Sequence, residues 1–344
     1  MAQPEDLVSR FLGADVRTLI MRVLVTAQDV GGMTGDEVVQ FLESSFGAFQ
    51  EGQRADGWKW NGPQLNEALR ELASHRMIEQ GTDGRYVVTP LGRLAGQGAI
   101  EVESVMRVVD CLSGLQTEDI TDPVLLVAAQ VTTELDAVLF PINKRSTQKE
   151  PQAWLGELQR QRVASGALRS MQRHVIEQHT ATLRAKKAVA CLYYVTGTEM
   201  NEIERVMTQF GGSFDGAAGP IRSVASRTAD MLPVIARVGE LLRPGLDLSS
   251  RASRLTVRLE YGVGADAVDI ARLAGRDFGR GDYRRLSAAG LTNAAAIETA
   301  SDDLILEQVE DDADKLRVVR LFAETVRLRE RDKGPIVSLQ PYQS

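Results

Sequence analysis

The sequence predicts a mainly α-helical protein with one short β-hairpin near residue 80. Three observations lead to this prediction. Apolar residues recur at helical spacing along nearly all of the 344 residues. Only one stretch, RMIEQGTDGRYVVTP, alternates between apolar and polar residues as a strand does. A chain of this length is also too long for one ordinary core, so it should divide into about two or three domains.

The bulk composition favours a soluble globular protein, with 43% hydrophobic and 25% charged residues. No apolar run reaches the roughly 18 residues of a membrane span, and MAQPEDLVSR lacks the features of a secretory signal. Cys111 and Cys191 alone cannot form a disulfide framework. With only three histidines, no zinc site is expected either. We therefore expect a cytoplasmic protein with no membrane partner and no metal.

Residues 1–100 contain the elements of a winged-helix domain. VRTLIMRVLVTAQ forms a first helix, and Thr34 with Glu37 forms a capping box that opens a second. A third helix begins at Asn61–Gln64, and the hairpin follows around the turn Gly81–Gly84. The third helix buries an apolar stripe of Leu65, Ala68, Leu69 and Leu72.

The third helix is poorly suited to reading the major groove. Its outward residues include Glu67 and Glu71, which a phosphate backbone would repel. We therefore expect this domain to pack on a neighbouring domain. Trp58 and Trp60, in WKW, are candidate contacts for that packing. The alternative, that both tryptophans cover the winged-helix core, stays open.

Residues 101–245 form a helical bundle with no fixed repeat. Its longest segment, AAGPIRSVASRTADMLPVIARVGELLRP, should be kinked or divided at Pro233. The predicted buried side of this segment consists of Ile221, Ala225, Thr228, Leu232, Ile235, Val238 and Leu242. Arg222, Ser223, Ser226 and Arg237 fall on the opposite side, and Arg227 lies near its edge.

Charge is distributed unevenly along the chain. Residues 142–188 carry ten basic and three acidic side chains, a local charge of +7 in a chain whose net charge is −7. Such segregation fits a binding site for a polyanion, and it equally fits a solvated helix face. Both interpretations stay open.

Residues 246–332 should form a small helical domain, followed by a tail over 333–344. SSRASRLTVRLEYGV and ADAVDIARLAG are predicted helices, and Gly279 and Gly281 should bracket a tight turn between two short helices. The arginines around that turn are Arg276, Arg280, Arg284 and Arg285. Backbone amides of glycines at a helix N-terminus, supported by arginines, can hold a phosphate. Glycine also ends helices for purely structural reasons.

Two segments carry a resemblance to known proteins. RYVVTPLGRLAGQGAI resembles the junction between winged helix and bundle in the Ski-like group of superfamily 2 helicases. RLEYGVGADAVDIARLAGRDFGRGDYRRLSAAGLTNAAAI resembles the C-terminal helix-hairpin-helix region of the archaeal-type repair helicases in that group. The bundle is similar to their ratchet domain, which is shared with the Sec-type translocon accessory protein and spliceosomal helicases. The resemblance covers about residues 4–332.

The resemblance implies a winged helix, a ratchet-like bundle and a helix-hairpin-helix domain that together contact single-stranded DNA or RNA. It implies that Arg222, Ser226 and Arg227 contact the strand from the long helix. It also implies phosphate contacts from the hairpin, through Arg276, Arg280, Arg284 and Arg285. The backbone amides of Gly279 and Gly281 complete the predicted phosphate site. The family's long helix often presents an aromatic residue for base stacking, and none is present here. Base stacking is then either weak or supplied from elsewhere, for example by Tyr283.

The chain has no G-x-x-x-x-G-K-[ST] phosphate loop, so it should not act as an ATPase on its own. The resemblance implies RecA-like motor domains as a partner, either covalent or as a separate subunit, and places ATP and magnesium in that motor. The sequence resembles the family from the point where the motor ends, as a fragment or a split subunit would. The rival hypothesis is a free-standing adaptor that binds protein or nucleic acid without a motor.

Overall fold

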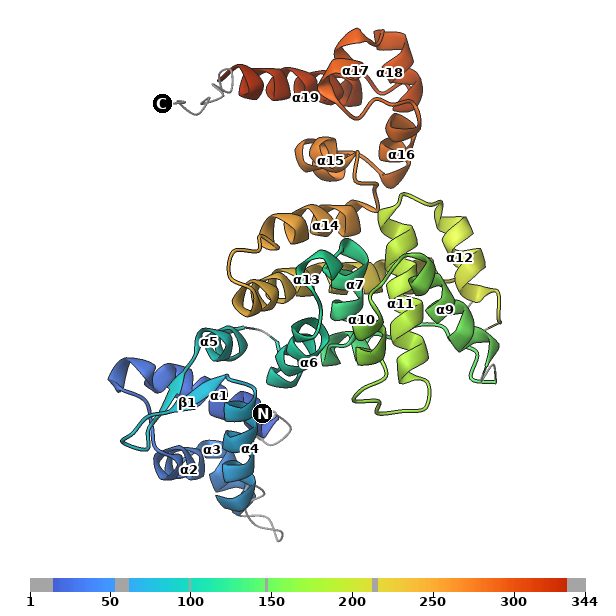
Figure 1. Ribbon diagram of the computed structural model, residues 1–344. Coiled ribbons are helices and arrows are strands. Elements are labelled where there is room, and N and C mark those ends of the chain that lie inside the picture. Colours follow the sequence, from blue (N-terminus) through green and yellow to red (C-terminus); the bar gives the residue numbers. More distant parts are fainter. Residues whose placement is uncertain (1–14, 53–61, 99, 146–147, 212–215, 333–344) are drawn as a thin grey trace, which may run out of the picture. The chain divides into compact units, whose positions relative to one another are not determined.

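The structure is a computed structural model that describes residues 15–52, 62–98, 100–145, 148–211 and 216–332 (Figure 1). It is mainly helical, as predicted, and the sheet in this part of the chain has two strands. Two compact units are present. The first unit comprises Met1–Leu139, Leu158–Ala185 and Pro233–Ser249, and the second comprises Phe140–Glu157, Lys186–Leu232 and Ser250–Ser344. The predicted domain boundaries stay a prediction.

The N-terminal part contains helices around a short hairpin. Its elements are α1 (Val16–Ala27), η2 (Gln28–Val30), α2 (Gly35–Glu43), α3 (Phe46–Gly52), α4 (Gly62–Ser74), β1 (Ile78–Gln80), β2 (Tyr86–Val88) and α5 (Pro90–Gln97). The predicted capping box is confirmed: the Glu37 amide donates to the Thr34 hydroxyl and the Thr34 amide donates to the Glu37 carboxylate. The predicted stripe of α4 is confirmed as well, because all four of its residues are buried.

The hairpin is antiparallel and pairs Ile78 with Val88 and Gln80 with Tyr86. A third backbone segment joins it, because the Tyr86 amide donates to the Met33 carbonyl oxygen over 2.8 Å. The loop before α2 is therefore anchored to the hairpin. Figure 1 shows the hairpin beside α1.

The start of α5 explains a glycine in the sequence TPLG. Thr89 caps this helix, since its hydroxyl accepts from the Gly92 amide over 3.1 Å. A Cβ atom at Gly92 would clash with the Met77 carbonyl group and the Met21 side chain. Only glycine lets α5 approach the hairpin this closely.

The central helices are α6 (Val102–Ser113), η3 (Thr117–Asp119), α7 (Asp122–Gln130), α8 (Thr133–Asp136), α9 (Lys149–Arg160), α10 (Ser165–Ser170), α11 (Thr180–Val195), α12 (Met200–Thr208) and α13 (Ala218–Leu242). α13 is continuous through Pro233, so the predicted division at that residue does not occur. Its predicted buried side is confirmed for six of the seven residues, and Leu242 is half-buried.

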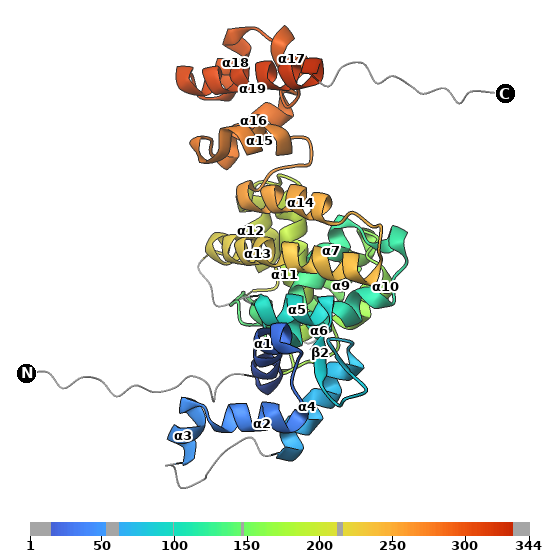
Figure 2. The same cartoon turned by 90° about the vertical axis from the view of Figure 1, so that its left-hand side faces the viewer.

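The C-terminal elements are α14 (Ser249–Tyr261), α15 (Val268–Ala274), η4 (Gly275–Asp277), α16 (Arg280–Ala288), α17 (Ala294–Thr299), α18 (Asp302–Gln308) and α19 (Ala313–Asp332). α17 and α18 pack against α19, as Figure 2 also shows. Their core includes Ile270, Leu286, Ile297 and Val319, all fully buried. Gly279 precedes α16 and Gly281 lies inside it, so the helix begins between the two glycines that were predicted to bracket a turn.

Within the described ranges, no helix is long and apolar enough to cross a membrane. Trp58 and Trp60, the predicted contacts of the N-terminal domain, lie outside the described residues.

Candidate nucleic-acid interface

The first half of α13 presents a polar ridge to solvent. Arg222 and Ser226 are exposed, while Ile221 and Ala225 beside them are buried. No ion pair is found for Arg222 among the residues that the structure describes. Arg227 is half-buried and lies 3.5 Å from the Asp230 carboxylate. The ridge therefore carries one unneutralised guanidinium group and one that is loosely paired.

Arg280, at the start of α16, is turned into the protein. Its Nε donates to the Gly262 carbonyl oxygen over 2.8 Å, and its Nη2 donates to the Thr198 carbonyl oxygen over 2.5 Å. Its guanidinium carbon lies 4.7 Å from the centre of the Tyr194 ring, a cation–π contact. Arg280 thus connects α16 to the loop after α11 and to the end of α14.

Gly262 makes room for this side chain. The residue has φ +65°, and a Cβ atom there would clash with the guanidinium group of Arg280 and the ring of Tyr194. A side chain at this position would be strained by its backbone angle and would also displace Arg280. The glycine in the Y-G-V sequence at the end of α14 is therefore explained by its backbone angle and by the close approach of Arg280.

Three predicted site residues from distant parts of the sequence come together in the second unit. Burial lowers the pKa of Arg280, and the charges of Arg284 and Arg222 lower it further. Arg284 also donates to the Glu199 carboxylate over 2.7 Å, and that hydrogen bond is the main cause of a lowered pKa of Glu199. The charges of Arg222 and Arg284 therefore both reach Arg280, and Glu199 lies beside Arg284 and within reach of Arg280. We call Arg222, Arg280 and Arg284 the arginine cluster.

The other predicted phosphate contacts are arranged differently. Arg276 is almost fully exposed and lies 3.8 Å from Glu260. Arg285 is engaged within the C-terminal domain, by the Asp282 and Glu310 carboxylates and the Gln308 carbonyl oxygen. The arginine cluster does not include either residue.

The glycine turn is already capped by a carboxylate. The Gly279 amide donates to Asp282 over 2.8 Å, and Asp282 also binds Lys315 over 2.8 Å. Asp282 is 4% exposed. A phosphate approaching the Gly279 amide would have to displace this buried carboxylate, so Gly279 is better explained as a helix cap. Gly281 is exposed within the first turn of α16.

The prediction that Tyr283 supplies base stacking is wrong. Its side chain is 1% exposed, and its hydroxyl donates to the Gly275 carbonyl oxygen over 2.7 Å. The ring packs against Tyr261 and Phe278 in the core formed by the C-terminal helices. It cannot stack on a base without opening that core.

The interpretation of residues 142–188 as one basic surface is wrong for three of the ten cations. Arg184, Lys186 and Lys187 are at most 1% exposed. Lys186 lies 2.6 Å from the buried Glu150 carboxylate and over the Trp154 ring, and burial lowers its pKa. Arg184 donates to both carboxylate oxygens of Asp136. These charges stabilise the interior and are out of reach of a polyanion.

Sequence reasoning missed a small pocket beside Arg284. It has a volume of about 270 Å³, and its lining includes Thr196, Gly197, Gly264, Arg284 and Ser287. The turns that form it are written in the sequence as VTGT and YGVG. The glycines in these two motifs indicate that loops approach each other closely, but they do not indicate which loops do so.

Cysteines and potential metal ligands are the other side chains that could take part in a reaction. Burial raises the pKa of Cys111 to about 11 and that of Cys191 to about 12, so both thiols stay protonated at neutral pH. In the described part of the chain, no group of three or more His, Cys, Asp or Glu residues could hold a metal ion.

Comparisons with known proteins give no assignment. The chain matches no protein-family model and no curated protein sequence.

Proposed function

We propose that this chain is a motorless accessory module of a superfamily 2 helicase. It binds the backbone of single-stranded nucleic acid and supports strand translocation by an ATPase motor supplied elsewhere, in the cytoplasm. The observation that supports this most is the arginine cluster, in which the charges of Arg222 on α13 and Arg284 on α16 both act on Arg280, with Glu199 beside Arg284. Such an excess of positive charge is what a contact to backbone phosphates requires.

The N-terminal elements support the winged-helix interpretation. Helices α1, α2 and α4 precede the hairpin, and Met33 adds a strand-like contact to β2. The long helix α13, with Arg222 and Ser226 outward, supports the ratchet interpretation of the bundle. The proposed partner, a pair of RecA-like motor domains, rests on the resemblance.

The chemistry of the cluster determines how binding should behave. The outward face of α13 carries Arg222 and Ser226 without an aromatic residue, and Tyr283 is buried. Binding should therefore depend on phosphate charge more than on base stacking. Contacts to backbone phosphates do not depend on the base sequence and are easily exchanged as the strand moves.

Nucleic-acid binding gives the direct test. We expect the Arg222→Ala/Arg284→Ala variant to bind a fluorescein-labelled oligo(dT) roughly ten-fold more weakly, because two phosphate contacts are lost. The loss should be similar for oligo(dA) and oligo(U), and the slope of log affinity against log salt should fall by about two. Fluorescence anisotropy at several salt concentrations measures both quantities.

The matched control removes two other exposed arginines of the same unit. Arg254 and Arg317 pair with Asp269 and Asp314, so Arg254→Ala/Arg317→Ala removes equal charge outside the arginine cluster. If this control weakens binding as much as the cluster variant does, or if neither does, the cluster is not the binding site.

A second expectation concerns ATP. Without a phosphate loop, the purified chain should neither bind nor hydrolyse ATP, with or without magnesium. An equilibrium binding assay with a fluorescent ATP analogue and a phosphate-release assay measure the two properties. Turnover that copurifies with the chain through several chromatographic steps would contradict the expectation.

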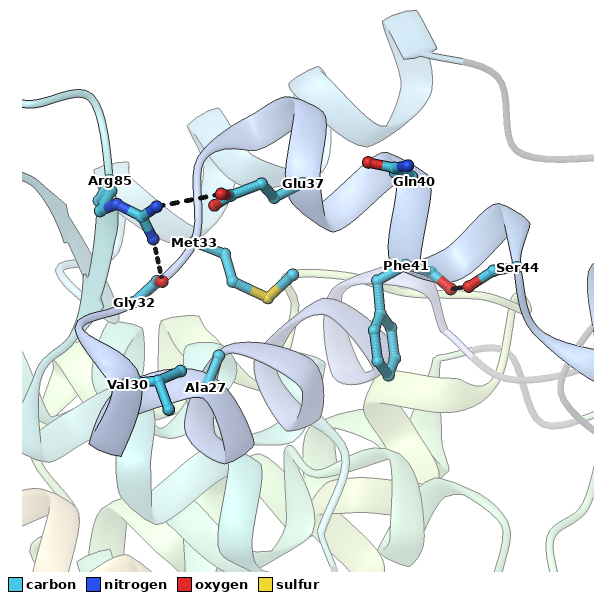
Figure 3. A pocket seen from close by; sticks show the side chains of 9 residues that line it. All are labelled: Ala27, Val30, Gly32, Met33, Glu37, Gln40, Phe41, Ser44 and Arg85. Carbon is cyan, nitrogen blue, oxygen red and sulfur yellow. Dashed lines mark hydrogen bonds and ion pairs between the residues drawn. The ribbon is translucent and has the colours of Figure 1, made fainter.

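The adaptor hypothesis stays open as the second candidate. The observation that favours it is an apolar groove in the N-terminal part of the chain, lined by Val30 and Phe41, both exposed (Figure 3).

A further inference from the structure

The small pocket beside Arg284 has a lining that indicates the class of its ligand. Three segments of the second unit form it: the turn after α11, the turn after α14, and α16. A Cβ atom at Gly197 would lie 3.7 Å from the Gly264 nitrogen and 4.0 Å from the Arg284 Cγ, so the three segments meet closely here. At about 270 Å³, the pocket falls just below the roughly 300–1,000 Å³ of sites for drug-sized ligands. It therefore suits a group of one or two small rings.

The two hydroxyl groups of the lining act as hydrogen-bond acceptors toward a ligand. The Thr196 hydroxyl donates its proton to the Tyr193 carbonyl oxygen over 2.9 Å, and the Thr198 hydroxyl lies 3.1 Å from it. The Ser287 hydroxyl donates its proton to the Asp266 carboxylate. A hydroxyl group has one proton and two lone pairs, so each oxygen keeps a lone pair for a ligand but has no proton left to donate.

Gly264 and Arg284 supply hydrogen-bond donors to the same pocket. No acceptor for the Gly264 amide is found over the residue ranges that the structure describes. Arg284 donates to the Glu199 carboxylate through Nη2. Because a guanidinium group carries five N–H bonds, Arg284 can still donate to a phosphate and to a group in the pocket. The lining therefore presents donors and acceptors together.

This mixture distinguishes between classes of ligand. A phosphate group only accepts hydrogen bonds, so it would meet the lone pairs of Thr196 and Ser287. The Asp266 carboxylate, which binds Ser287, would repel it as well. A cation only donates hydrogen bonds, and it would be repelled by Arg284. An unpaired nucleobase offers donors and acceptors along one edge, and it therefore matches the lining.

We propose that the pocket holds one unpaired base of the bound strand, while the arginine cluster holds the neighbouring phosphates. The base edge accepts from Arg284 and the Gly264 amide, and it donates to the oxygens of Thr196 and Ser287. Each of the bases has both kinds of group on its Watson–Crick edge, so the site favours unpaired bases without selecting a sequence. This inference rests on the proposed function, because its ligand is the same single strand.

A strand without bases tests this inference directly. The full chain should bind a fluorescein-labelled oligo(dT) of about 12 nucleotides roughly five-fold more tightly than an equally long strand of tetrahydrofuran abasic units, because the hydrogen bonds to the base are lost. Fluorescence anisotropy measures both affinities. The two strands carry the same phosphates, so the arginine cluster contributes equally to each. Equal binding would overturn the base pocket and leave the proposed function standing, whereas the absence of binding to either strand would overturn both.

Two neighbouring alanines at the end of α16 locate the site. Ala288 lines the pocket, and Ala289, which is also exposed, does not. Ala288→Leu fills the pocket, so this variant should bind oligo(dT) only as well as it binds the abasic strand. Ala289→Leu should keep the difference between the two strands. Leucine favours helices, and thermal unfolding should show that both variants are folded. If both variants lose the difference, or if neither does, the base does not enter this pocket.

The accepting hydroxyl groups provide a second readout. The Thr196→Val/Ser287→Ala variant removes both oxygens without adding bulk to the pocket. It should bind oligo(dT) about two- to three-fold more weakly than the parent chain, and its affinity for the abasic strand should be unchanged. A structural role for the two hydroxyl groups would instead weaken the binding of both strands alike. That result would overturn their assignment as contacts to the base.

Discussion

Replacing Asp136 by alanine should lower the free energy of unfolding by about 3–5 kcal/mol. Asp136, at the end of α8, accepts from Arg107 on α6 over 2.9 Å and from the Arg184 Nε on α11 over 2.8 Å. The side chains of Arg107 and Arg184 are 8% and 1% exposed. Removing the carboxylate leaves two buried guanidinium groups, and no other acidic partner is found for Arg184 in the described part of the chain. Chemical denaturation followed by circular dichroism measures the loss.

A surface aspartate provides the control for this prediction. Asp314 lies 2.9 Å from Arg317, and both side chains are more than three-quarters exposed. Asp314→Ala should leave the unfolding midpoint nearly unchanged, because an exposed ion pair contributes little. A similarly small change in Asp136→Ala would show that the carbonyl oxygens of Met171, Arg173 and His174, which also accept from Arg184, are enough to hold it.

The elements of the fold could be predicted where one residue pattern determines one element. The stripe of α4 and the capping box at Thr34 depend on residues three or four positions apart, and both are confirmed. The hairpin follows from alternation around a glycine turn, and it pairs as expected. The division predicted at Pro233 does not occur: α13 continues through this residue, and Ile221, Leu232 and Ile235 on its inner side are buried.

Charged residues were harder to place, because helical spacing identifies a face but not what covers it. Lys186 and Lys187 belong to a segment whose charge pattern predicts a basic surface, and both residues are buried. The countercharge of Lys186 is Glu150, which lies 36 positions earlier. No local pattern contains a pairing over that distance. The same limit applies to Arg280, whose acceptors at Tyr194 and Thr198 lie more than 80 positions away.

The predicted site residues stay a prediction, and the structure places them in different surroundings. Arg222 and Ser226 lie outward on α13, and Arg284 lies beside Arg280 near a pocket. Gly279 instead binds Asp282, and Arg285 binds Glu310. An arginine of the cluster can contact phosphate directly, or it can hold the neighbouring loops in place. Arg280 is the residue at which these two roles can be distinguished.

Arg280→Ala should lower the free energy of unfolding by about 2–3 kcal/mol, because a charged donor to buried carbonyl groups and a cation–π contact are lost together. Hydrogen exchange should accelerate in Thr196–Glu199, the loop that Arg280 holds. Nucleic-acid affinity should also fall, since this loop carries Glu199, the partner of Arg284. By contrast, Arg222→Ala should weaken nucleic-acid binding without a measurable change in stability, because Arg222 is exposed.

Gly262→Ala separates positioning from direct contact. The added methyl group displaces the Arg280 side chain while every charge is retained. If Arg280 acts as a positioning residue, Gly262→Ala should reproduce the exchange pattern and the affinity loss of Arg280→Ala, and the double variant should be little worse than either single one. If Gly262→Ala leaves affinity intact or raises it while Arg280→Ala lowers it, then Arg280 touches the phosphate backbone directly. In that case the salt slope should fall by about one in Arg280→Ala alone.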